Sequence, residues 1–74
     1  MFLTDFEYQR LLPHREKILR FKETRKYKGD EMILFDQIRR SKGGQPTFFD
    51  CDGCKAELLN DVSNIIIEYE TRKI

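Results

Sequence analysis

Residues 56–70 read AELLNDVSNIIIEYE, and the apolar positions in this stretch repeat with a helical period. Four of them follow one another at spacings of three, four and three residues: Leu59, Val62, Ile66 and Tyr69. Leu58 and Ile65 widen the same stripe. A period of about 3.5 residues aligns such side chains along one side of an α-helix. The stretch therefore predicts a long C-terminal helix whose stripe packs against other helices or against a second copy of the chain.

Three extended alternatives remain open beside this helix. Consecutive β-branched residues lower helix propensity, so the stretch 65–74 is also compatible with a strand. Apolar residues at odd positions in 19–27 and the short apolar run 32–35 allow the same interpretation. We expect an all-α domain of three to four helices, and an α+β domain with a short hairpin is the alternative.

The N-terminal residues carry a clear helix start. Thr4 and Glu7 have the spacing of a capping box, in which each side chain binds the other residue's backbone N–H. Leu3 and Tyr8 occupy the positions of a hydrophobic staple. Pro13 interrupts a helix because it lacks the N–H and crowds the preceding turn. We expect a short first helix, a break near Leu12, and a second helix of about twelve residues that ends near Tyr27. The alternative is one helix that kinks at Pro13 and continues through His14 to Tyr27.

Glycines divide the middle of the chain. Gly29 and Asp30 suit the end of one helix and the start of the next, which we expect over residues 30–42. The pair Gly43-Gly44 is expected to end that helix. Residues 45–53 are then a loop, in which Phe48-Phe49 anchor against the core and Asp52 caps the last helix.

Length and composition limit the class of protein. The 74 residues, 39% hydrophobic and 36% charged, suit a single helical domain over 1–74. Chains this short often need a partner, a metal or a disulfide for stability. MFLTDFEYQR has neither a basic segment nor an apolar stretch of signal length, and no apolar run approaches the roughly 20 residues that span a membrane. We therefore expect a cytoplasmic protein with no membrane partner.

Charge is segregated along the chain although the formal net charge is only +1. Residues 14–28 hold seven cations and two acids, whereas residues 43–74 hold three cations and six acids. The candidate binding cations are Arg15, Lys17, Arg20, Lys22, Arg25 and Lys26, which Arg39 and Arg40 extend. They can meet nucleic-acid phosphates, an acidic protein, or the chain's own C-terminal helix within the monomer or across a dimer. A solvated helix face is the plainer interpretation, and no known nucleic-acid-binding motif accompanies these cations.

Cys51-Asp52-Gly53-Cys54 is the one short motif with specific chemistry. Two thiolates separated by two residues can bind one zinc ion, and residues 49–54 resemble half of a zinc-ribbon knuckle. A structural zinc site needs four ligands, which a symmetric dimer supplies in zinc-hook proteins. The pair can also cycle between dithiol and disulfide. The plainer interpretation is two buried thiols that fill space, because a reducing compartment keeps cysteines unpaired.

No catalytic pattern is visible in the sequence. His14 is the only histidine, and nothing in the sequence places an acid or a nucleophile beside it. We therefore expect a non-enzymatic protein-binding module. It is a small regulator or adaptor that docks on a larger protein, as bacterial and phage accessory factors do, and it needs no cofactor. The alternatives are a nucleic-acid-binding protein that uses the basic segment 15–28, and a homodimer stapled by zinc at Cys51 and Cys54.

Overall fold

A computed structural model describes residues 3–27 and 32–72. In chain order the elements are α1 (Asp5–Leu11), a 3₁₀ turn η1 (Leu12–His14), α2 (Arg15–Thr24), α3 (Met32–Ser41) and α4 (Asp52–Arg72). The described residues form no strand, so the expected all-α fold is confirmed and the α+β alternative is wrong for them.

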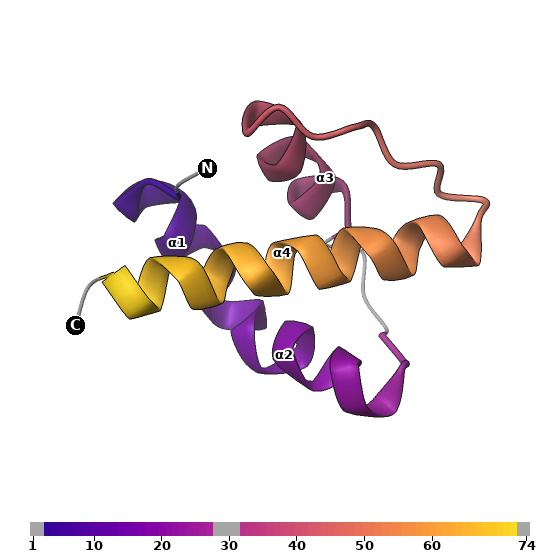
Figure 1. The fold of residues 1–74 in the computed structure, drawn as a ribbon, viewed down its shortest axis with the longest axis horizontal. Helices are drawn as coiled ribbons and strands as arrows, with labels where there is room; N and C mark the ends of the chain where they lie inside the picture. The colour runs from indigo at the N-terminus through magenta and orange to yellow at the C-terminus, as the bar shows by residue number, and fades with distance from the viewer. Residues whose placement is uncertain (1–2, 28–31, 73–74) are drawn as a thin grey trace.

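Helix α4 runs the length of the molecule, with α2 packed along one side and α3 along another (Figure 1). Its 21 residues extend about 30 Å at the usual rise of 1.5 Å per residue, close to the 35 Å long axis of the molecule. The predicted stripe is confirmed, because Leu59, Val62 and Ile66 are at most 1% exposed. Tyr69 is half-buried. The stripe packs within the chain, against a core completed by Leu3, Leu11, Ile18, Phe21, Phe35 and Ile38.

The expected helix start at Thr4 is confirmed in detail. The Thr4 hydroxyl accepts the Glu7 backbone N–H at 3.2 Å, and the Glu7 carboxylate accepts the Thr4 backbone N–H at 3.0 Å. Pro13 lies in η1, where the helix tightens before α2 begins. The break thus redirects the chain without a long loop, and Leu11 and Ile18 on either side of it are both fully buried.

Helix α2 ends three residues earlier than expected. Arg25 adopts the left-handed conformation with φ 57°, and its N–H donates to the Phe21 carbonyl oxygen at 2.8 Å. Arginine takes a position that glycine usually fills, which no sequence pattern announces. The expected caps at Gly29 and Asp30 lie outside the described residues.

Glycine ends α3 as expected. Gly43 has φ 86°, and the Gly44 N–H donates to the Arg39 carbonyl oxygen at 3.0 Å. A Cβ atom on Gly44 would lie 2.6 Å from Cγ of Arg39 and 2.9 Å from its carbonyl oxygen. The chain leaves α3 so close to Arg39 that only glycine fits.

Two expectations for the loop before α4 are wrong. Phe48 and Phe49 are 67% and 41% exposed, so they do not anchor on the core. Asp52 is the first residue of α4, and the side chain of Cys51 accepts the N–H of Cys54 in its place as the cap, at 3.1 Å. Among the described residues, no helix combines the length and the hydropathy that crossing a membrane requires.

Candidate functional site

The basic segment of α2 is partly neutralised by α4. Arg15 binds Glu70 with two hydrogen bonds, Nε to Oε2 at 2.5 Å and Nη2 to Oε1 at 2.8 Å. The Tyr8 hydroxyl donates to the same Oε2 at 2.5 Å. These donors, Arg15 above all, hold the pKa of Glu70 at about 2, although burial opposes the shift. Arg15 therefore acts within the molecule and is not a free cation for a partner.

A second set of contacts joins α1 to the same end of α4. The Tyr8 and Tyr69 rings stack with centroids 4.3 Å apart, and the Tyr69 hydroxyl donates to the Asp5 carboxylate. That carboxylate raises the pKa of Tyr69 to about 12. We call Asp5, Tyr8, Arg15, Tyr69 and Glu70 the terminal clamp, because they join the first two helices to the end of the last.

The other cations of α2 face solvent. Arg20 pairs with Glu16 one turn earlier at 2.8 Å, and Lys22 donates to Asn64 on α4 at 2.9 Å. Three of the predicted cations border one hollow of about 250 Å³, whose lining residues are Lys17, Arg20, Thr24, Lys26 and Tyr27. Arg25 lies elsewhere, with its guanidinium 6.0 Å from the centre of the Phe21 ring. The predicted basic surface therefore shrinks to Lys17, Arg20 and Lys26, which run from the first turn of α2 to just beyond its end.

Arg39 does not extend that surface, contrary to the expectation. It is 6% exposed, and its guanidinium binds Asp61 on α4 at 2.9 Å, the Gln45 carbonyl oxygen at 2.8 Å and the Thr47 hydroxyl at 2.9 Å. Arg40 is exposed but pairs with the buried Asp36 at 3.3 Å. Arg39 therefore acts within the structure, and the charge of Arg40 is partly neutralised by Asp36.

The same network fixes the path of the loop between α3 and α4. Besides the contacts of Arg39, the Asp36 carboxylate accepts the backbone N–H of Thr47 at 2.9 Å. Residues 45–47 are thus tied directly to α3 by two buried charged side chains, and through Arg39 to Asp61 on α4. Immediately beyond this anchor, Phe48 and Phe49 point their rings into solvent.

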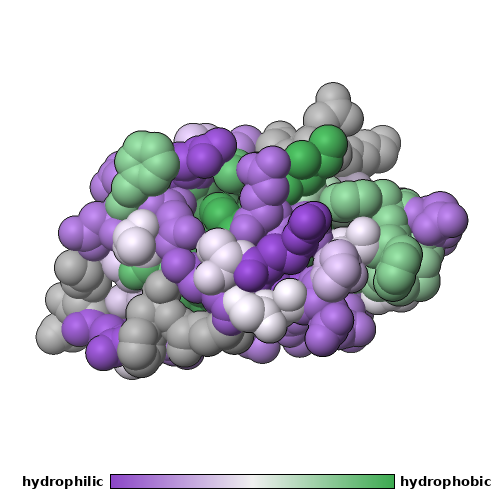
Figure 2. Space-filling view, turned by 90° about the horizontal axis from the view of Figure 1, so that it is seen from above, coloured by the Kyte–Doolittle hydropathy of each residue, from purple (hydrophilic) through white to green (hydrophobic). Residues whose placement is uncertain are grey.

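Ile33 is a third exposed apolar side chain. It is 62% exposed on α3 and lies one helical turn before Asp36, whose carboxylate binds the loop at Thr47. Figure 2 looks onto the face that carries α3 and the loop, and hydrophobic atoms gather at the end where the loop turns into α4. We call Ile33, Phe48 and Phe49 the aromatic loop surface.

The two cysteines are neither fully buried nor free thiols, so the plainer interpretation of them is wrong. Cys51 and Cys54 are joined in a disulfide, and both are half-buried. In this state neither sulfur is a thiolate that can bind zinc. In the described parts of the chain, no group of three or more metal-ligating side chains comes together.

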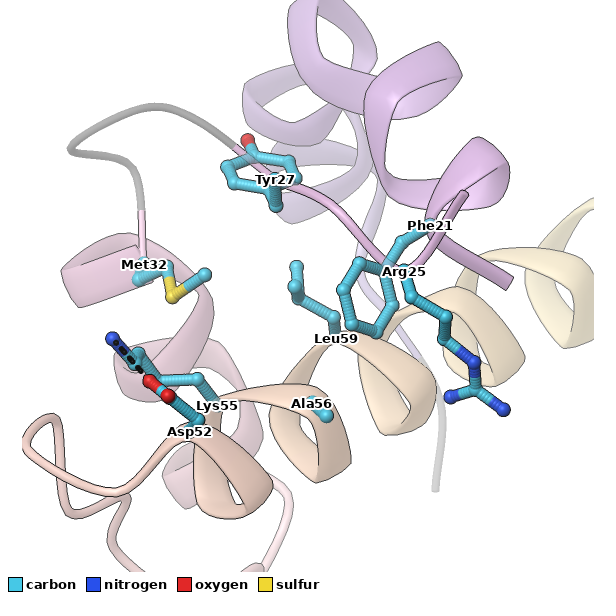
Figure 3. Close-up of a pocket in the computed structure, with 8 residues that line it drawn as sticks. All are labelled: Phe21, Arg25, Tyr27, Met32, Asp52, Lys55, Ala56 and Leu59. Atoms are coloured by element: carbon cyan, nitrogen blue, oxygen red, sulfur yellow. Dashed lines mark ion pairs between the residues drawn. The ribbon is translucent and has the colours of Figure 1, made fainter. Parts of the chain in front are cut away.

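One hollow was not foreseen in the sequence. It measures about 320 Å³ and lies where the end of α2, the start of α3 and the start of α4 meet (Figure 3). Its apolar walls come from Phe21, Met32 and Leu59, and the ion pair between Lys55 and Asp52 borders its rim. Such a hollow accommodates an apolar side chain.

Sequence reasoning missed the anchor of the loop more than any other feature. Arg39 follows Phe35 by four residues, which places it on the buried side of α3. That spacing was the available signal, but an arginine in the last turn of a helix usually faces solvent. Comparisons with protein-family models, with curated proteins and with solved structures found no match.

Proposed function

We propose that this chain is a non-enzymatic protein-binding module, a small regulator or adaptor that docks on a larger protein through its aromatic loop surface. The observation that carries the proposal is the exposure of Phe48, 67%, directly after a loop that buried charges hold in place. Proteins seldom expose neighbouring large apolar side chains unless a partner covers them.

The anchored loop lowers the entropic cost of docking. Ordering a mobile interface side chain costs about 0.5–1.5 kcal/mol, and prior fixation of the backbone avoids part of the loss. Arg39 and Asp36 supply that fixation through Thr47. An interface gains most from a few aromatic anchors, and burial of one phenylalanine contributes roughly 1.5–3 kcal/mol.

The shape of the surface favours a protein over a small molecule. Sites for small molecules are concave and enclose most of the ligand. Phe48 and Phe49 instead project from the molecule, and Ile33, Phe48 and Phe49 carry no group that transfers protons or attacks a substrate. The surface therefore suits insertion into a groove of a larger protein.

The test compares two variants in a pull-down from nuclease-treated lysate of the source cells. In the first, Phe48→Ser and Phe49→Ser are combined. The control is Phe6→Ser, which removes an aromatic ring that is 71% exposed on α1. We expect the double variant to lose a protein partner that the wild type and the control both retain. Thermal unfolding should be nearly unchanged in all three, because these rings already face water. Equal retention by all three would contradict the proposal.

A second candidate function is nucleic-acid binding along α2. The hollow bordered by Lys17, Arg20 and Lys26 also contains Tyr27, and cations beside an aromatic ring suit a phosphate and a base. Binding to single-stranded nucleic acid should then weaken steeply between about 50 and 200 mM salt. Lys17→Glu with Lys26→Glu should abolish it, whereas Lys22→Glu, outside the hollow, should reduce it less. Absence of binding at the lower salt concentration removes this candidate.

A further inference from the structure

We propose that Cys51 and Cys54 form a thiol–disulfide exchange site, which acts on an accessible disulfide of a protein or a small molecule. Cys51 is the attacking sulfur and Cys54 the resolving one. This activity goes beyond protein docking and does not depend on it, because it rests on two sulfur atoms and the helix that begins between them.

The structure makes the two sulfurs unequal. Cys51 caps α4, and its Sγ accepts the backbone N–H of Cys54 at 3.1 Å. The N-terminus of a 21-residue helix also carries a partial positive charge of roughly half a unit. Both effects stabilise a thiolate at Cys51 when the disulfide is reduced. Cys54 lies within the first turn of the helix and supplies the amide.

Charged neighbours leave this preference in place. Lys55 follows one turn after Cys51, and its N–H donates to the Cys51 carbonyl oxygen at 3.1 Å. Its ammonium lies 3.4 Å from the Asp52 carboxylate. The side chain of Asp52 is fully exposed and Asp50 is exposed as well, so solvent screens both of these acids. The amide contact is direct and is screened much less.

A substrate has room to approach the pair. Both cysteines are half-buried, and a Cβ atom added at Gly53, between them, would meet no atom within 4 Å. The exposed rings of Phe48 and Phe49 precede the pair by two to three residues and offer apolar contact to the chain around a substrate disulfide. The site is thus open on the side of Gly53.

The exchange balances without any further reactant. The Cys51 thiolate attacks one sulfur of the substrate disulfide, whose S–S bond breaks, and the other substrate sulfur leaves as a thiolate that takes a proton from water. Cys54 then loses its proton and attacks Cys51, which releases the second substrate sulfur. The substrate gains two electrons and two protons, and the chain is left with the disulfide seen in the structure. A small dithiol restores the reduced pair by the reverse reaction.

Single-cysteine variants test the asymmetry. Cys54→Ser retains Cys51, and Cys51→Ser retains Cys54. Each is mixed with oxidised glutathione, and formation of the mixed disulfide is followed by mass spectrometry. A thiolate that forms one pH unit lower is about tenfold more abundant at neutral pH, but its intrinsic nucleophilicity is about threefold lower. We therefore expect Cys51 to react roughly threefold faster than Cys54 at pH 7.

The pH profile of alkylation by iodoacetamide provides the second readout. Its midpoint for Cys51 should lie about one pH unit below that for Cys54, and circular dichroism should report the same helicity for both variants. Midpoints that coincide, or a reversed order, would overturn the proposal. A folding defect in one variant is bypassed with wild-type chain, whose two thiols are alkylated singly and located by peptide mapping.

Redox buffers test whether the pair cycles. Wild-type chain is equilibrated in glutathione buffers of graded ratio, and free thiols are trapped by alkylation. We expect one reversible transition between no modification and two modifications, with no dimer linked by disulfides. A pair that stays fully reduced or fully oxidised in all buffers would refute the exchange site. Uptake of one zinc ion by two reduced chains would also refute it, because the thiolates would then be metal ligands.

Discussion

Arg39 is the residue on which the path of the loop depends. Its guanidinium binds α4 through Asp61 and the loop through Gln45 and Thr47, so one side chain links three segments. A buried cation is tolerated only when its hydrogen bonds are made. Both terminal nitrogens of Arg39 have hydrogen-bond partners, and only its Nε has none among the described residues. The neighbouring Arg40 is exposed and, among the described residues, pairs with Asp36.

The two arginines give a matched prediction. Arg39→Ala should lower the free energy of unfolding by roughly 2–3 kcal/mol, because it removes charged hydrogen bonds and leaves buried acceptors unpaired. Arg40→Ala should cost less, about 0.5–1 kcal/mol, since Arg40 itself is exposed and the buried Asp36 keeps its hydrogen bond from the Thr47 N–H. Urea unfolding followed by circular dichroism measures both. Similar losses for the two variants would contradict the assigned role of Arg39.

For single residues, contacts between neighbours in the sequence were predictable, and contacts between residues far apart in the sequence were not. The capping box of Thr4 and Glu7 followed from their spacing, because both partners lie within one turn. The partner of Arg39 is 22 residues away, a distance that no local pattern spans. The exposure of Phe48 was misjudged because hydrophobicity states a preference for burial, while only the packed neighbours decide whether space exists.

Among the elements, α4 shows how a β-branched stretch can remain helical. Ile65 and Ile66 are 9% and 0% exposed, whereas Ile67 is 44% exposed. A strand would place Ile65 and Ile67 on one face. The buried residues instead lie one helical turn apart, because Ile65 and Ile66 follow the buried Val62 by three and four residues. Burial against α2 and α3 thus outweighs the modest loss of helix propensity.

Adjacent isoleucines of α4 should respond very differently to truncation. Ile66→Ala should lower the free energy of unfolding by about 2–5 kcal/mol, because it leaves a cavity in the core. Ile67→Ala should change it by no more than about 0.5 kcal/mol, since lost contacts are offset by the better helix propensity of alanine. Thermal and urea unfolding report both values. A larger loss at Ile67 would mean that its exposed face is covered, for instance by a second chain.

Helix positions were predictable from periodicity, and helix ends less so. The stripe of α4 and the glycine end of α3 both appeared as expected, because each has a strong sequence signal. The end of α2 did not, since Arg25 enters the left-handed region without being glycine. Its N–H donates to the Phe21 carbonyl oxygen, and its guanidinium lies 6.0 Å from the centre of the Phe21 ring.

Across the whole molecule, segregated charges meet inside the monomer. The basic α2 binds the acidic α4 through Arg15 and Glu70. Helix α3 is tied to α1 by Lys42 and Glu7, whose side chains are 11% and 19% exposed and lie 2.5 Å apart. The sequence left four partners open for the basic segment: nucleic acid, an acidic protein, and the C-terminal helix of the same chain or of a second chain. What remains for a partner is the small set of cations along α2, Lys17, Arg20 and Lys26, and the aromatic loop surface.

Glu70 predicts how stability depends on pH. Its pKa is lowered from 4.5 to about 2 in the folded chain, so its contribution is present above pH 4.5 and is lost as the pH falls toward 2. The melting temperature of the wild type should therefore drop more steeply over this range than that of Glu70→Gln. Glu57→Gln removes an exposed acid from the same helix and should keep the wild-type slope. Parallel curves for wild type and Glu70→Gln would contradict the clamp.

The candidate site was predictable only in part, because a sequence pattern reveals only residues that are close together in the chain. Cys51 and Cys54 stood out because three residues of separation is a chemical motif in itself. The aromatic loop surface has members from α3 and from the loop, Ile33 and Phe48-Phe49, which are 15 or more residues apart in the sequence. Only the folded chain brings such separate positions together.

The length of α4 has a practical consequence for handling the molecule. The terminal clamp lies at one end of this helix, and Cys51 caps the other, about 30 Å away at the usual helical rise (Figure 1). A dye or a sensor-chip linker attached at Arg72 is thus mounted on the clamp side. The opposite tip, with its rings and its sulfurs, then faces the bulk liquid, so immobilised protein should bind as freely as protein in solution.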